Sequence, residues 1–105
     1  MRTGVQTKGE VFKILKEHSS QLKSLGVKEV GLFGSFRRNE QTQDSDIDLL
    51  VRFDPAQKTF DNFMRLSGLL EELLQRRVEI ITTEALSPYV GPHILRDVEY
   101  ASLSA

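Results

Sequence analysis

The sequence predicts an α/β (α+β) domain in which helices pack on a small mixed β-sheet of about three strands. Three apolar runs at 27–33, 46–53 and 76–82 have the content of strands. Between them lie segments whose apolar residues recur every three or four positions, which is typical of helices. The resulting order of helix, strand, helix, strand, helix, strand and helix indicates one sheet layer with helices packed on it.

Length and composition predict one domain, with residues 1–8 as a flexible N-terminus and 9–105 as the folded part. The formal net charge of −1 provides no overall basic field, so direct nucleic-acid binding is not expected. The absence of cysteine excludes disulfides and thiolate metal sites. No segment approaches the ~20 apolar residues of a membrane span, and no secretion signal is recognised, so we expect a cytoplasmic protein without a membrane partner.

The first half of the chain is predicted to contain a helix, a strand and a short helix. The apolar stripe over 9–25 predicts a helix that Gly26 ends. The strand over 27–33 follows, and the polar stretch 36–43 is expected to form a short helix that continues into a loop.

The second half begins with the strand over 46–53, which "DPAQ" ends. Residues 59–75 have a broad leucine-rich face and predict a helix. The strand over 76–82 comes next. A helical turn and a helix near 92–100 are then expected, because Pro88 and Pro92 interrupt the chain between them.

Gly34 and Ser35 lie directly after an apolar strand and before the short helix, an arrangement that can bind phosphate. The first amides of a helix have no partner within it, the helix dipole favours an anion there, and glycine permits close approach. The Ser35 hydroxyl adds a donor, and Arg37 and Arg38 follow within one turn. The alternative is an ordinary strand-to-helix turn in which Ser35 is the N-cap.

Asp46 and Asp48 are two residues apart in a predicted strand, so their side chains are expected on one face, about 6.8 Å apart. Two unit charges at that distance repel by roughly 2 kcal/mol at an effective dielectric near 20. Asp48 lies inside an apolar run, since residues 49–51 are apolar. A solvated pair of charges is one interpretation. A site for Mg²⁺, which prefers carboxylate and phosphate oxygens, is the other.

Glu79 repeats this pattern, because it lies between Val78 and Ile80 in the third apolar strand. If this strand neighbours that of Asp46 and Asp48, the three carboxylates can face one patch. Three converging acids are what two-metal phosphoryl transfer requires. The alternative is an edge-strand residue that faces water.

The spacing of these motifs resembles the nucleotidyltransferase superfamily, in which Gly-Ser is followed by Asp-x-Asp. Here Asp46 lies eleven positions after Ser35, and the stretch 45–51 reads SDIDLLV. Over roughly residues 9–100 the chain looks like the minimal nucleotidyltransferases. These are small proteins of the polymerase-beta-type fold that include MntA-like antitoxins paired with HEPN-domain toxins.

Three positions depart from the usual pattern of that family. Arg37 stands where alanine is usual, and Asn39 stands where glycine is usual. Asparagine tolerates a positive φ better than most residues. Glu79 stands where many relatives have aspartate, and its carboxylate therefore reaches one methylene further.

The resemblance implies Mg²⁺-dependent transfer of AMP from ATP to an acceptor hydroxyl, with two Mg²⁺ ions. The carboxylates would hold the metal and the triphosphate, and the carboxylate of Glu79 would also assist deprotonation of the acceptor hydroxyl. The implied catalytic and metal-binding residues are Asp46, Asp48 and Glu79, and the implied nucleotide-binding residues are Gly34, Ser35, Arg38, Asp46 and Asp48.

The resemblance also implies a partner, a HEPN-domain toxin encoded next to the chain and modified on a tyrosine. A chain of this length leaves no room for a domain that binds an acceptor, and a homodimer is a further expectation. Two alternatives stay open: an inactive or weak antitoxin that acts by binding alone, and a nucleotide-sensing module. The presence of all three acids favours catalysis, because binding alone would not require them.

Overall fold

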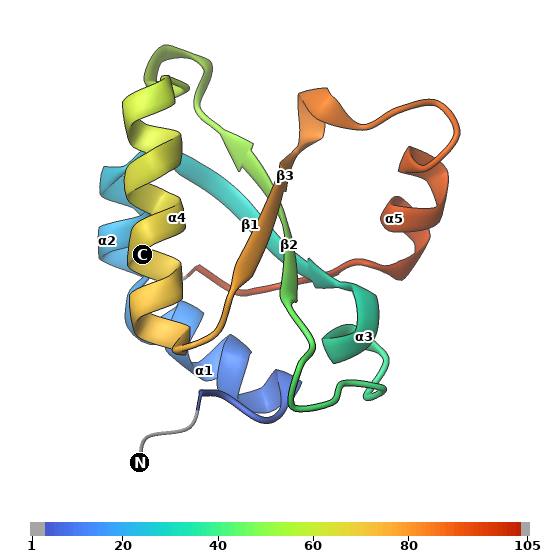
Figure 1. Ribbon diagram of the computed structural model, residues 1–105. Helices are drawn as coiled ribbons and strands as arrows, with labels where there is room; N and C mark the ends of the chain where they lie inside the picture. Colours follow the sequence, from blue (N-terminus) through green and yellow to red (C-terminus); the bar gives the residue numbers. More distant parts are fainter. Residues whose placement is uncertain (1–3, 104–105) are drawn as a thin grey trace.

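A single mixed sheet organises the computed structural model, which describes residues 4–103 (Figure 1). Its strand order is β3-β2-β1-β4. The strands β1 and β2 pair antiparallel, β2 and β3 pair parallel, and β4 pairs antiparallel with β1. The bounds are β1 Val27–Phe33, β2 Ile47–Phe53, β3 Val78–Thr82 and β4 Glu99–Tyr100.

Helices cover the sheet unequally. In Figure 1, α1, α2 and α4 lie together on one side, whereas α3 and α5 lie toward the other. Two short 3₁₀ turns, η1 and η2, follow β2 and β3. The bounds are α1 Lys8–Glu17, α2 Ser19–Ser24, α3 Gly34–Arg37, η1 Pro55–Gln57, α4 Phe60–Leu74, η2 Thr83–Ala85 and α5 Gly91–Asp97.

The two faces of the sheet carry two apolar clusters of different size. Leu49 and Val51 of β2 belong to the larger cluster, beneath α1, α2 and α4. Leu50, which points the other way, packs with Phe33 and Ile94 in a smaller cluster beneath α5. The face that carries Leu50 therefore has the thinner cover.

Local signals explain where the two long helices begin. The Thr7 side chain accepts a hydrogen bond from the Glu10 amide, and the Glu10 carboxylate accepts one from the Thr7 amide. This reciprocal capping box starts α1. The Thr59 hydroxyl caps α4 by accepting from the Asn62 amide.

The first predicted helix is instead two helices. His18, with φ −111° and ψ 23°, ends α1 and precedes α2, and its Nδ1 lies 2.9 Å from the carbonyl oxygen of Ile14. The predicted end at Gly26 holds, because Gly26 has a φ of 93°. The break turns α2 so that both helices bury residues against the sheet.

The prediction of three strands was one short, and the predicted helix near 92–100 ends at Asp97. Glu99 and Tyr100 instead pair with β1, where the Ala101 amide donates to the Val30 carbonyl. Gly31 makes this pairing sterically feasible, since a Cβ there would collide with Val98.

The segment expected to be flexible, 1–8, is in part docked against the domain; residues 1–3 lie outside the described residues. Val5 is buried, and its amide donates to the Leu74 carbonyl at 3.1 Å. None of the helices within residues 4–103 is long and apolar enough to cross a membrane.

Candidate active site

Asp48 and Glu79 are register neighbours on the parallel strands β2 and β3. Register neighbours project to the same face of a sheet. Asp48 shares its face with Leu50, two residues on, so both carboxylates lie on the thinly covered face. The prediction for Glu79 required its strand to be the neighbour of the strand that carries Asp48. The structure shows this adjacency.

The Gly34 turn meets Asp48 directly. Phe33, the last residue of β1, pairs with Asp48, and Gly34 then adopts a φ of 77° as α3 begins. A Cβ at position 34 would collide with the Asp48 carboxylate. Glycine is needed here both for its left-handed backbone and for this close approach. The Gly-Ser turn therefore lies directly against Asp48.

The Asp48 carboxyl is half-buried and crowded by negative charge. Burial, and to a smaller extent the carboxylates of Glu79 and Asp46, together raise its pKa to about 6, whereas Arg38 opposes the shift. Three ionised acids in this position disfavour one another unless a cation or a proton intervenes. The negative potential of these carboxylates therefore favours the binding of a cation.

The donor set suits Mg²⁺ when a triphosphate completes it. Within residues 4–103, no three His, Cys, Asp or Glu side chains are arranged to hold a metal ion by themselves. Mg²⁺ usually binds one or two carboxylates together with substrate phosphates and water. Asp46 and Asp48 fit that role by their chemistry, and the metal-binding roles of Asp46, Asp48 and Glu79 all stay predictions.

Arg38 directly follows α3 at the edge of the site, where two carboxylates bind it. Its Nε donates to Glu40 Oε1 at 3.1 Å, and its Nη1 donates to Asp97 Oδ2 at 2.8 Å. The next residue, Asn39, has a φ of 59°. That residue therefore adopts the left-handed conformation for which glycine is usual at this position. Arg38 lowers the pKa of Asp48, so its charge lies within electrostatic reach of the acids.

Sequence reasoning missed Asp97, the last residue of α5. Its Oδ2 accepts from the Gly34 amide at 2.8 Å as well as from Arg38. The Gly34 N–H, predicted to face phosphate, thus already has an anionic acceptor. An acid in the last turn of a helix opposes the helix dipole, and that was the available signal.

A comparison with known families identifies the domain. The profile of the nucleotidyltransferase domain family matches residues 11–101, which is most of the chain. The chain belongs to the nucleotidyltransferase domain family.

Individual relatives agree with this assignment. The nucleotidyltransferase is 37% identical over 92 residues to the protein adenylyltransferase MntA of Thermococcus cleftensis, covering 87% of this chain and 92% of that protein. A solved structure titled "Structure of putative minimal nucleotidyltransferase" is 35% identical with a TM-score of 0.74, covering 86% of this chain and 92% of that one.

A more distant solved structure contains a tri-AMPylated HEPN toxin of Shewanella oneidensis in complex with an MNT antitoxin. The matched chain is 15% identical with a TM-score of 0.56, and the match covers 84% of this chain and 71% of that one. At that identity the likeness to this nucleotidyltransferase concerns the fold alone.

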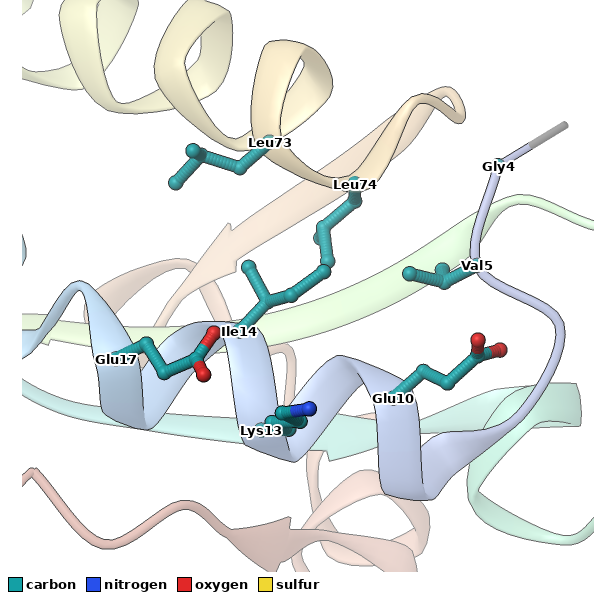
Figure 2. Close-up of a pocket in the computed structure, with 8 residues that line it drawn as sticks. All are labelled: Gly4, Val5, Glu10, Lys13, Ile14, Glu17, Leu73 and Leu74. Carbon is teal, nitrogen blue, oxygen red and sulfur yellow. The ribbon is translucent and has the colours of Figure 1, made fainter. Parts of the chain in front are cut away.

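The pocket in Figure 2 lies away from the nucleotidyltransferase motifs. It has a volume of about 260 Å³ and lies between the N-terminal segment, α1 and the end of α4. Glu10, on its wall, is already engaged in capping α1. The lining residues are Gly4, Val5, Glu10, Lys13, Ile14, Glu17, Leu73 and Leu74, and none of them belongs to the site of Asp48.

We expect metal-free nucleotidyltransferase to lose stability as pH rises through the titration of Asp48. The folded state holds this proton with a pKa of about 6 and the unfolded state with one near 3.8. The free energy of unfolding therefore falls between about pH 4 and pH 6 and is level above that range for this group. A shift of about two units corresponds to about 3 kcal/mol, which the half-exposed position reduces to about 1–2 kcal/mol.

Chemical denaturation in EDTA at about pH 5 and pH 8 measures this effect against Asp48→Asn, which cannot titrate. The wild-type chain should lose about 0.5–1 kcal/mol more than the variant over this interval, because about half of the total change has already occurred by pH 5. Equal losses in the two proteins would contradict the assignment.

Proposed function

We propose that the chain transfers AMP from ATP to a tyrosine hydroxyl of a HEPN-type toxin, with Mg²⁺, and thereby acts as its antitoxin. The observation that carries this proposal is the meeting of Asp48 with both Glu79 and the Gly34 turn. A phosphate-binding turn placed against carboxylates is suited to a metal-bound triphosphate. The whole arrangement lies on the thinly covered face, where an acceptor can approach.

The roles of the residues follow from their chemistry. The hydroxyl of Ser35 and the guanidinium of Arg38 bind and orient the phosphates. Asp46 and Asp48 hold Mg²⁺, which when bound neutralises phosphate charge. The acceptor oxygen attacks the α-phosphorus, and the bond to the leaving pyrophosphate breaks. Glu79, the most exposed of the three acids, takes the proton of the acceptor hydroxyl.

The proposed partner draws support from the relatives and from the surface near α5. One relative is named a protein adenylyltransferase, and one solved complex contains an AMPylated HEPN toxin. The chain before and along α5 exposes apolar side chains, with Tyr89 at 85%, Val90 at 54% and Leu95 at 53%. Ile94 is buried, so it belongs to the core. These exposed residues provide a surface that a protein acceptor can contact.

Incubation of the chain with α-labelled ATP, Mg²⁺ and the protein encoded beside it tests the proposal. The partner should become labelled, the label should resist denaturation, and EDTA should abolish it. Replacing the labelled tyrosine of the partner with phenylalanine should also remove the signal.

Other results would support the alternatives. A tight complex that forms without label would indicate an antitoxin that acts by binding alone. Labelled nucleotide that stays on the chain without a partner would indicate a sensor. Either outcome would overturn the catalytic proposal.

A further inference from the structure

Arg76, between α4 and β3, makes the largest set of side-chain contacts to backbone near the site. Its Nη1 donates to three carbonyl oxygens of the loop that joins α3 to β2. The acceptors are Thr42 at 3.2 Å, Gln43 at 3.0 Å and Ser45 at 2.9 Å. Nε and Nη1 donate from different positions of one planar group, so the guanidinium can bind carbonyls of two separate segments that the single nitrogen of an ammonium could not reach together.

The same guanidinium contacts two further segments of the chain. Its Nε donates to the Val5 carbonyl at 2.7 Å, and its central carbon lies 4.9 Å from the centroid of the Phe36 ring. Phe36 is fully buried in α3, directly after Ser35. Arg76 therefore links the N-terminal segment, the helix of the Gly-Ser turn and the loop that follows it.

Apart from the contacts of Arg76, the hydrogen bonds that residues 42–45 form within residues 4–103 are internal to the loop. The Ser45 amide donates to the Thr42 carbonyl at 3.2 Å, and the Ile47 amide donates to the Arg77 carbonyl at 3.0 Å. Asp46 lies between these two contacts, and Arg76 donates to the carbonyl of Ser45, the residue directly before it. The direction in which the chain presents Asp46 therefore depends on the guanidinium.

We infer that Arg76 is a positioning residue of the active site, which sets the loop conformation that brings Asp46 beside Asp48 and the helix of Ser35. This inference rests on the proposed function, in which Asp46 holds the metal and nucleotide. The charges that act on Asp48 come from Glu79, Asp46 and Arg38, so Arg76 works through geometry.

Arg76→Lys tests the inference because it keeps the positive charge and the aliphatic stem and removes the fork. Arg77→Lys is the matched control, since Arg77 is adjacent, exposed and makes no side-chain hydrogen bond within residues 4–103. Three quantities are measured: the melting temperature, the Mg²⁺-dependent binding of a non-hydrolysable ATP analogue, and amide hydrogen exchange.

We expect Arg76→Lys to stay folded, to exchange faster at residues 42–47, and to bind the analogue about tenfold or more weakly. Transfer to the partner should fall about ten- to a hundredfold. Arg77→Lys should match the wild-type chain in each measurement.

Two outcomes overturn the inference. The first is unchanged analogue binding with faster exchange in the loop, because loop geometry would then not matter to the site. The second is faster exchange throughout the domain with a matching loss of melting temperature, which would make Arg76 a general stabiliser. Absence of Mg²⁺-dependent binding by the wild-type chain would instead contradict the proposed function, and the inference that depends on it.

Discussion

Replacement of Asp48 by asparagine is expected to reduce AMP transfer by about a thousandfold or more while the chain stays folded. The amide is nearly isosteric with the carboxylate, but it loses the charge that attracts the metal. The loss should be larger than for any other single acid, because Asp48 touches Gly34 and neighbours Glu79. Stability should be retained, since the variant also relieves repulsion among the acids.

Initial rates of label transfer to the partner, with matched amounts of each protein, measure this effect. Asp44→Asn is the control, because Asp44 is an exposed acid of the loop that precedes β2 and its side chain makes no hydrogen bond within residues 4–103. It should transfer at the wild-type rate. Transfer by Asp48→Asn within about tenfold of the wild type would exclude the proposed role of this carboxylate.

Gly34→Ala is expected to damage both stability and transfer. An alanine at a φ of 77° costs about 1–2 kcal/mol in backbone strain. Its Cβ would also collide with the Asp48 carboxylate, which is fixed by its place in β2. We expect the free energy of unfolding to fall by about 1–3 kcal/mol in total. Transfer should fall further than stability explains, because Asp48 must move.

Gly68→Ala provides the matched control in α4. A Cβ there meets nothing within 4 Å, and the position lies inside a helix. It should stabilise the chain by about 0.5–1 kcal/mol and leave transfer unchanged. Denaturant unfolding and transfer rates on the same preparations separate the two effects. Equal stability of the two alanine variants would contradict the account of the Gly34 turn.

The sequence predicted the central elements because their signals are local. The strands around Gly31 and Asp48 are apolar runs with turn-forming residues at their ends, and α4 has an uninterrupted apolar face. The break at His18 was missed because the apolar stripe continues through it. The strand β4 was missed because it exists only through a distant partner, Gly31, whose missing side chain makes room for it.

The sequence predicted the motif residues of the site, but it did not predict the residues that hold them in place. Gly34, Asp48 and Glu79 reveal themselves as a turn signal and as charges within apolar runs. Asp97 and Arg76 form hydrogen bonds with residues that are far away in the sequence, at separations from 31 to 63 positions. Only the folded topology brings these residues together. No short spacing connects them to the motifs, so a single sequence does not connect them to the site.

The uneven cover of the two sheet faces bears on which molecules can reach the reaction centre. Within residues 4–103, the short helices α3 and α5 are the ones that lie toward the side that holds the carboxylates, so the proposed chemistry would take place on a thinly covered surface. A side chain on the convex surface of another folded protein can arrive there without unfolding. A small free acceptor would meet few walls to hold it, and selectivity must then come from the fit between two macromolecular surfaces.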